Sequence, residues 1–178
     1  MNTTAWEHRR VLAIDPFSRG FGFILLEGPH QLVDWGVTHT RANKQGRCLA
    51  RVADLMHHYE PDVIVVEDVA AKGCRRCERV QQLIGEIRRC ATERRIAIRS
   101  FPRLKVKRVF TEANAHNKHE IAVAIAGRFP ELASRLPPFR KPWMSEDDRM
   151  SIFDALGLAL TLFHSGHRSS PAPRGPRN

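Results

Sequence analysis

Two runs of consecutive apolar residues, each followed by a carboxylate, constrain this chain more than any other feature of its sequence. Residues 11–14 precede Asp15, and residues 63–66 precede Glu67. Short, uninterrupted apolar runs are typical of strands buried on both faces, as in the parallel part of an α/β sheet. Because sequential parallel strands joined by a crossover lie close together, we expect Asp15 and Glu67 to meet at one edge of the sheet.

Each of these carboxylates also has an ordinary explanation. An aspartate before a proline, as in Asp15-Pro16, is a common turn former, and Glu67 would be the first solvated residue after its strand. We expect the first strand to end here, since proline stops the hydrogen-bonded ladder. Two acids at equivalent strand ends nevertheless indicate a shared site.

The remaining patterns predict a mixed sheet flanked by helices. Strands are expected over residues 20–27, 32–38 and 96–101, and helices over 44–59, 77–95, 118–129 and from the Ser145 N-cap to about His164. This order predicts an α/β fold with a central five-stranded sheet, its first three strands forming an antiparallel meander. A chain of 178 residues suits one domain, expected over residues 1–164, followed by a disordered basic tail over residues 165–178.

A third acid, Asp154, interrupts the apolar segment IFDALGLALTLF (residues 152–163). A buried, unpaired charge is costly, so Asp154 should meet a cation, a partner group or a water-filled space. A bound metal ion would neutralise the Asp154 carboxylate. Oxygen-rich sites select Mg²⁺ or Mn²⁺, and two such ions activate water and stabilise the leaving oxygen in phosphodiester hydrolysis.

The overall charge favours a polyanionic partner. The chain has a net charge of +10, and leaving out the three arginines of residues 165–178 lowers it only to +7. Binding to nucleic acid releases condensed counterions, which favours such a basic surface. The chain shows no signal-peptide pattern and no apolar run long enough to span a bilayer, so we expect a soluble, cytoplasmic protein without membrane contact.

Three motifs resemble those of the RuvC-type Holliday-junction resolvases, nucleases of the RNase H-like superfamily. VLAIDPFSRGFGF (residues 11–23) is similar to their opening strand and turn, VIVVEDVAAK (63–72) to their second acidic strand, and FDALGLALTLF (153–163) to their last helix. The resemblance implies an RNase H-like fold and Mg²⁺-dependent cleavage of branched DNA by a homodimer, with Asp15, Glu67 and Asp154 as metal ligands. It also implies that Lys107 and Lys118 contact DNA phosphates or assist catalysis.

The sequence departs from the family pattern at two places. Ser151 stands where the family has an acid or histidine, three residues before the last aspartate. On a continuous helix Asp147 would share a face with Asp154, about 10 Å along the axis, so Asp147, Asp148 or Ser151 with a bound water could complete the metal site. In addition, residues 69–73 (VAAKG) lack the aromatic residue that in the family wedges into the junction.

Further basic residues are expected at the DNA. The segment RLKVKR alternates basic and apolar side chains, so that one face would pack and the other would face phosphate. The predicted DNA contacts outside the two family lysines are Arg103, Lys105, Arg108, Lys72, Arg75 and Arg76. Cys74 and Cys77 have zinc-ligand spacing and Cys90 follows, but no second pair completes a tetrahedral site, and reduced thiols in a basic loop are the simpler interpretation.

The sequence thus predicts a structure-selective endodeoxyribonuclease that acts in recombination and repair. Two alternatives remain: a nuclease of the same fold acting on RNA or mobile-element DNA, and a nucleic-acid-binding module that has lost full metal binding. Ser151 is the residue that keeps the second alternative open.

Overall fold

A computed structural model describes residues 8–41 and 44–167. Its centre is a five-stranded sheet with the order β3-β2-β1-β4-β5, in which β1, β2 and β3 are antiparallel neighbours and β4 runs parallel to β1 and β5. The predicted antiparallel opening and parallel crossovers are both confirmed. The strands are β1 (Arg10–Phe17), β2 (Gly20–Glu27), β3 (Gln31–His39), β4 (Val63–Glu67) and β5 (Ala97–Phe101).

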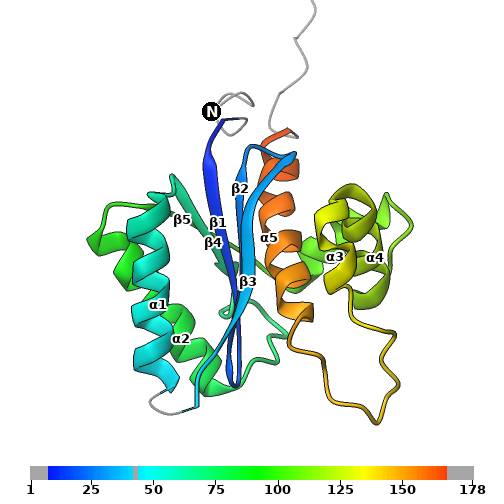
Figure 1. Ribbon diagram of the computed structural model, residues 1–178, viewed down its shortest axis with the longest axis horizontal. Helices are drawn as coiled ribbons and strands as arrows, with labels where there is room; N and C mark the ends of the chain where they lie inside the picture. The colour runs from blue at the N-terminus through cyan, green and yellow to red at the C-terminus, as the bar shows by residue number, and fades with distance from the viewer. Residues whose placement is uncertain (1–7, 42–43, 168–178) are drawn as a thin grey trace, which may run out of the picture.

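Helices cover both faces of this sheet (Figure 1). One face carries α1 and α2, and the other carries α5, with α3 and α4 packed beyond it. The helices are α1 (Lys44–Tyr59), α2 (Glu78–Glu93), α3 (Arg103–Thr111), α4 (Lys118–Arg128), the 3₁₀ turn η2 (Pro130–Arg135) and α5 (Met150–His167). Within the described residues no helix is long and apolar enough to cross a membrane.

The two-residue period of the strands sorts their side chains between the two cores. In β1, Leu12 and Ile14 face α1 and α2, whereas Val11 and Ala13 face α5. Asp15 is the next residue on the α5 side. The same alternation in β4 places Glu67 on that side, after Val63 and Val65.

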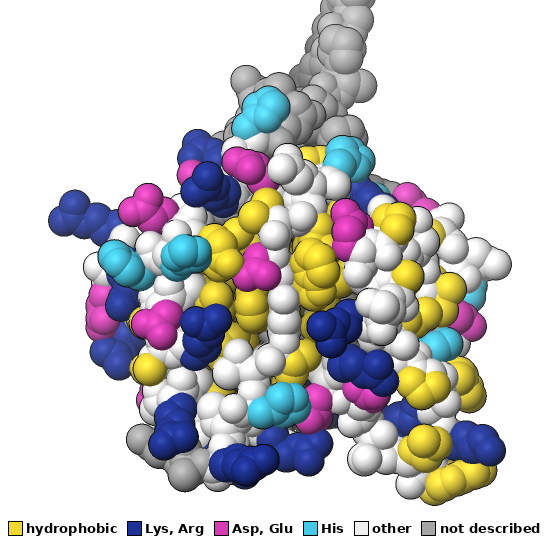
Figure 2. All heavy atoms as spheres, in the orientation of Figure 1, with side chains coloured by type: hydrophobic (Ala, Val, Ile, Leu, Met, Phe, Trp, Pro, Cys, Tyr) yellow, Lys and Arg dark blue, Asp and Glu magenta, His cyan; other side chains and the backbone are white. Residues whose placement is uncertain are grey.

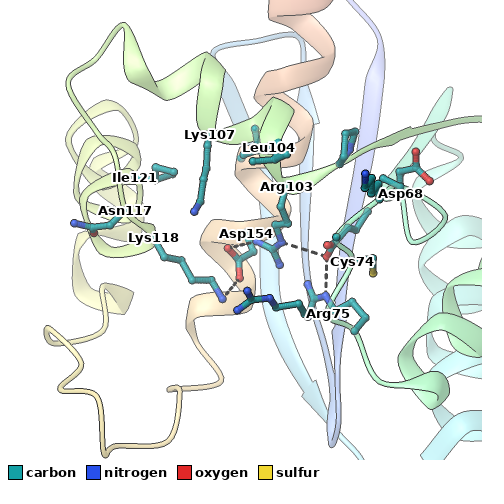
Figure 3. Close-up of a pocket in the computed structure, with 18 of the residues that line it drawn as sticks. Asp68, Cys74, Arg75, Arg103, Leu104, Lys107, Asn117, Lys118, Ile121 and Asp154 are labelled. Carbon is teal, nitrogen blue, oxygen red and sulfur yellow. Dashed lines mark hydrogen bonds and ion pairs between the residues drawn. The ribbon is translucent and has the colours of Figure 1, made fainter.

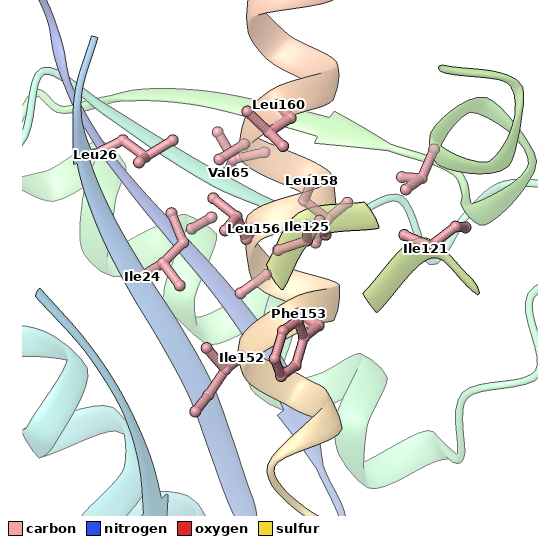
Figure 4. Packing of buried hydrophobic residues seen from close by; sticks show 14 of the residues in the cluster. Ile24, Leu26, Val65, Ile121, Ile125, Ile152, Phe153, Leu156, Leu158 and Leu160 are labelled. Atoms are coloured by element: carbon pink, nitrogen blue, oxygen red, sulfur yellow. The ribbon is translucent and has the colours of Figure 1, made fainter. Parts of the chain in front are cut away.

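Helix α5 is the central element of the second core (Figure 4). Ile152 and Leu156 lie against the strands that carry Ile24 and Val65, while Ile125 of α4 covers the helix from the outer side. Being covered on both sides explains why this helix is apolar almost all round. An acid on such a helix is therefore enclosed by protein.

The first strand continues past the predicted stop at proline. Asp15 and Pro16 both lie inside β1, where they pair with Gly22 and Phe21 of β2. The pairing of β1 with β4 ends at Ala13, so β1 has a partner on one side only beyond that residue, and a strand position with a free side tolerates a missing N–H.

The last helix begins at Met150, five residues after the predicted N-cap Ser145. The acids Glu146, Asp147 and Asp148 lie in the approach to the helix, where Asp147 accepts a hydrogen bond from the backbone N–H of Arg149. The prediction of a first turn rich in acids was wrong: Glu146 and Asp148 pair with Lys118 and Arg19 of other segments, and Asp147 pairs with Arg149 just before the helix. The helix ends at His167, and the remainder of the predicted tail lies outside the described residues.

The segment RLKVKR forms the start of α3, so its alternation does not separate basic from apolar side chains. A helix repeats every 3.6 residues, and alternate residues do not share a face. Leu104 is 62% exposed while Val106 is buried. Arg103 turns toward the sheet edge, as described below.

Candidate active site

The three acids singled out in the sequence meet at the end of the sheet nearest the start of α5. The parallel register pairs Ala13 with Val65, and continuing it by two residues sets Asp15 beside Glu67. Asp154, one turn into α5, faces the same strand ends. Asp15 and Glu67 are 2% and 3% exposed, so the site is a buried carboxylate cluster.

A single guanidinium contacts all three acids. Arg103 Nη1 lies 2.6 Å from Asp154 Oδ1, Nη2 lies 3.0 Å from Asp15 Oδ1, and Nε lies 3.2 Å from Glu67 Oε2. Arg103 can do this because it is the first residue of α3, separated from the end of β5 by Pro102 alone. Figure 3 shows Arg103 reaching from α3 toward Asp154 on α5.

A second guanidinium enters from the loop between β4 and α2. Arg76 Nε lies 2.6 Å from Glu67 Oε2, and Arg76 also pairs with Asp15 and donates to the carbonyl of Pro16. Lys118, the first residue of α4, adds a third cation with its Nζ 2.7 Å from Asp154 Oδ2. The three carboxylates are therefore balanced by Arg76, Arg103 and Lys118.

Burial and charge act differently on two of these carboxylates. Burial raises the pKa of Asp15 to about 6, against the opposing effects of Arg103 and Arg76. Burial also acts to raise the pKa of Asp154, but Arg103 and Lys118 outweigh it and hold this pKa below its ordinary value. Asp154 is thus the more strongly held anion, and Asp15 is the acid that releases its proton near neutral pH.

The candidates for a fourth ligand lie next to the cluster without joining it. Asp147 forms an ion pair with Arg149, with Nη2 2.6 Å from Oδ2, and this contact lowers the pKa of Asp147. Asp148 pairs with Arg19 at 2.9 Å. The buried Ser151 hydroxyl donates to the Asp148 carbonyl at 2.5 Å. The helical argument that placed Asp147 on the face of Asp154 fails, because α5 begins after it.

A hollow nevertheless joins these acids to the cluster. It has a volume of about 370 Å³, and its lining includes Asp15, Asp154, Asp147, Asp148 and Ser151. Glu146 also borders it and pairs with Lys118 at 2.6 Å. Each candidate therefore faces the space beside the cluster, although cations now engage the carboxylates.

A larger cleft of about 630 Å³ opens on the other side of Asp154, between the β4–α2 loop and helices α3 and α4 (Figure 3). Lys107 and Lys118 project into it from the two helices. The predicted DNA contacts that line this cleft are Lys72, Arg75, Arg76, Arg103, Lys107 and Lys118. Lys105 and Arg108 lie outside its lining, on the exposed side of α3.

The cysteines do not form a metal site. Cys90 lies on the buried face of α2, where its thiol contacts the sulfur of Met56 on α1 at 4.0 Å, while Cys77 is exposed at the other end of α2. All four cysteines, the others being Cys48 and Cys74, are free thiols. This agrees with the interpretation of incidental thiols in a basic loop.

The acid cluster has the donor chemistry for a hard divalent cation. Carboxylate oxygens are the ligands that Mg²⁺ and Mn²⁺ prefer, and burial removes competing water. Across residues 8–41 and 44–167, however, no group of three or more His, Cys, Asp or Glu side chains is arranged to hold a metal ion. The guanidinium of Arg103 takes the central place. A divalent cation could use these donors only in place of the Arg76 and Arg103 guanidiniums.

Comparison with known proteins reveals relatives at the level of structure. No protein-family model and no curated protein sequence matches the chain. Thermus thermophilus RuvC in complex with a Holliday-junction substrate superposes with a TM-score of 0.66 at 22% identity, covering 91% of this chain and 98% of RuvC. A second T. thermophilus RuvC structure gives a TM-score of 0.64 at 22% identity, with coverages of 88% and 95%. The chain has the RuvC fold.

A third structure shares this fold at a lower sequence identity. The yeast mitochondrial Holliday-junction resolvase Ydc2 superposes with a TM-score of 0.63 at 14% identity, covering 93% of this chain and 82% of Ydc2. The RNase H-like fold class predicted from the sequence is therefore confirmed over most of the chain. At these identities the similarity concerns the RuvC fold, and the roles of individual side chains have to be argued from the site itself.

Sequence reasoning expected Arg76 and Arg103 at DNA phosphates and did not anticipate their contacts with the acids. The one signal available was the predicted cost of burying Asp154 without a cation. The cost of burying Asp154 predicts a cation beside it but does not indicate which residue supplies that cation. The acids that contact Arg103 lie 36 to 88 residues away in the chain, and those that contact Arg76 lie 9 to 61 residues away, so no local pattern encodes the pairing.

Proposed function

We propose that this chain is a nuclease that hydrolyses phosphodiester bonds in branched DNA with the help of divalent cations. The observation that carries the proposal is the convergence of Asp15, Glu67 and Asp154, three buried carboxylates from distant segments, beside a cleft lined by basic residues. A structure assembled only for stability would gain little from such a cluster, since apolar side chains fill a buried site at lower cost.

In this proposal Asp15, Glu67 and Asp154 hold Mg²⁺ or Mn²⁺, with Asp147 as the fourth ligand. Bound at such a site, two divalent cations activate water and stabilise the leaving oxygen of an in-line displacement. Before they bind, Arg76 and Arg103 neutralise the carboxylates and keep the acids in place. Both arginines also line the basic cleft, so a guanidinium displaced from the acids would be available to a substrate phosphate.

The basic residues of the cleft orient the substrate. Lys107 and Lys118 project into the space beside Asp154, where a phosphate would lie against their ammonium groups. Lys72 and Arg75 border the opposite wall, and Lys105 and Arg108 extend the basic surface along α3. A four-way junction is the proposed substrate because RuvC, whose fold this chain has, is known in complex with one. Two copies, each cutting one strand, would resolve it.

A second candidate function is binding without cleavage. The observation that favours it is the pair of arginines that occupies the carboxylate cluster. If these guanidiniums do not yield to a divalent cation, the chain binds branched nucleic acid and leaves it intact.

Cleavage of a labelled synthetic four-way junction in Mg²⁺ or Mn²⁺ tests the proposal, beside duplex, forked, single-stranded and RNA-containing controls. We expect paired nicks in the junction that are lost in Asp15→Asn and Asp154→Asn. Glu93→Gln is the matched control, because Glu93 pairs only with Arg89 on the exposed side of α2. Binding without cutting in either metal would favour the second candidate, and preferential cleavage of RNA would overturn the junction as substrate.

A further inference from the structure

The loop between η2 and α5, residues 136–149, presents large apolar side chains to solvent. Trp143 is 78% exposed, Phe139 is 67% exposed and Met144 is 44% exposed. Such a group of exposed rings marks an interaction surface. We refer to residues 139–144 as the aromatic turn.

The backbone of this loop holds Trp143 outward. The N–H of Met144 donates to the carbonyl of Lys141 at 3.0 Å, which closes a four-residue turn with Pro142 in its second position. Proline presets the backbone angle that this position needs. The Arg140 guanidinium also donates to the Met144 carbonyl and fastens the base of the turn. Trp143 therefore sits at the tip of an ordered turn.

The cations around the rings are not neutralised. Lys141 Nζ lies 5.4 Å from the centroid of the Trp143 ring, and Arg140 is its neighbour in the turn. In the part of the chain that the structure describes, neither Arg140 nor Lys141 forms an ion pair with a carboxylate. Figure 2 shows hydrophobic and basic side chains gathered at the lower right, where Figure 1 places this loop.

The loop is continuous with the carboxylate cluster. A hollow of about 750 Å³ is lined by Phe139, Arg140 and Met144 on one side and by His119 on the other. The His119 and Phe139 rings meet edge to face, with centroids 5.4 Å apart. This hollow shares Glu146 and Asp147 with the hollow that holds Asp15 and Asp154. A strand threaded past the cluster would therefore reach Phe139, Arg140 and Met144 of the aromatic turn, and Met144 is the next residue after Trp143 in the chain.

We propose that Trp143 is a stacking platform for an unpaired nucleobase of the strand that lies in the active-site groove, and that this strand passes Phe139 on its way to the platform. The inference rests on the proposed function, since it places a DNA strand beside the carboxylates. Exposed rings next to free cations match a base and its phosphate, because every base offers a flat apolar face and base–ring stacking tolerates any sequence. Arg140 and Lys141 bind the adjoining phosphates, and Trp143 holds the base out of its duplex.

Equilibrium binding without divalent cations tests this platform separately from cleavage. Trp143→Ala should weaken binding to single-stranded DNA and to a junction or fork with unpaired bases on the order of 10-fold, and duplex binding by less than about 2-fold. Trp143→Phe should restore most of the loss. Lys141→Gln should weaken the binding of all these DNAs alike, because a phosphate contact does not distinguish paired from unpaired bases.

A base analogue gives a direct second readout. 2-Aminopurine placed at the unpaired position should lose fluorescence on binding to the wild-type protein, through stacking, and keep it with Trp143→Ala. Equal effects of Trp143→Ala on paired and unpaired DNA, or none on either, would overturn the platform. Dissociation of a protein dimer by Trp143→Ala, with DNA binding intact, would assign the aromatic turn to protein contact instead. Absence of any DNA binding by the wild-type protein would refute the proposed function along with the platform.

Discussion

Arg103 Nη1 lies 2.6 Å from Asp154 Oδ1, and the same guanidinium reaches Asp15 and Glu67. A cation thus already stands among the acids that we propose as metal ligands. On this proposal Arg103 and a divalent cation would compete for the same carboxylate oxygens, and the folding stability of the protein would then depend on metal binding.

Replacing Arg103 should expose this competition. Arg103→Gln leaves a buried negative charge without its partner, and breaking a buried ion pair costs about 3–5 kcal/mol. Added Mn²⁺ should then raise the melting temperature of the variant more than that of the wild type, because the cation restores the missing charge. Differential scanning calorimetry with and without Mn²⁺ measures both effects.

The control for this experiment is Arg89→Gln. Arg89 pairs with Glu93 on the exposed side of α2, and surface pairs of this kind contribute at most about 1 kcal/mol. An Arg103→Gln variant that is as stable as Arg89→Gln without metal, or that responds to Mn²⁺ no more than the wild type does, would contradict the competition.

The buried Asp15 should make stability depend on pH with an unusual sign. Burial raises its pKa in the folded protein to about 6, whereas the unfolded carboxyl titrates near the ordinary value of 3.8. Between these values the unfolded chain binds fewer protons, so rising pH favours unfolding. From pH 4 to pH 7 the wild type should lose on the order of 3 kcal/mol relative to Asp15→Asn.

Urea unfolding of both proteins across this pH range, without divalent cations, measures the difference. Asp147→Asn serves as the comparison because the Arg149 contact lowers the pKa of Asp147. The charged Asp147 stabilises the fold above its ordinary pKa, and this stabilisation is lost as the pH falls through the pKa of Asp147 in the folded protein. Asp147→Asn should therefore be less stable than the wild type at pH 7 and equally stable in acid. If the free energies of unfolding of Asp15→Asn and the wild type differ by the same amount at every pH, the raised pKa of Asp15 is refuted.

The start of α5 should tolerate no side chain at Gly22 of β2. A Cβ atom there would lie 2.3 Å from Ser151 Oγ and 2.5 Å from the Ser151 carbonyl carbon. Gly22→Ala should therefore destabilise the fold by about 1–3 kcal/mol, and adding Ser151→Ala should not restore it, because the helix backbone itself is in the way.

Gly85→Ala on α2 is the matched control for Gly22→Ala. Nothing lies within 4 Å of the added Cβ at Gly85, and an alanine in a helix is favoured over glycine by about 1 kcal/mol. Chemical denaturation should give opposite signs for the two substitutions. Equal effects would mean that α5 does not pack on β2 as closely as the structure has it.

Lys107 should contribute to DNA affinity in a way that depends on salt. Lys107 is exposed and projects into the cleft, so Lys107→Ala should lower the slope of log affinity against log salt by about 0.9 on duplex DNA. Without divalent cations, Arg76→Gln should lower the slope less, because Arg76 is engaged by Asp15 and Glu67. Fluorescence anisotropy at several salt concentrations checks both slopes, and equal decreases would show that Arg76 leaves the acids when DNA binds.

The sequence by itself determined the sheet order and the meeting of two acids. Uninterrupted apolar runs that end at Asp15 and Glu67 are typical of parallel strands buried on both faces, and sequential parallel strands bring their ends to one edge of the sheet. The apolar segment around Asp154 likewise predicts an enclosed helix and a charge that needs a cation. These are consequences of periodicity and burial, which neighbouring residues encode.

Only the tertiary structure decided which cations meet the acids and where α5 begins. Arg103 contacts Asp15, which is 88 residues away, because α3 starts immediately after β5 at the same edge of the sheet. Ser145 and the three acids after it have the sequence of a helix start, yet Lys118 pairs with Glu146, Arg19 pairs with Asp148, and the helix begins at Met150. Ion pairs between distant segments depend on how whole elements pack, which the local sequence does not encode.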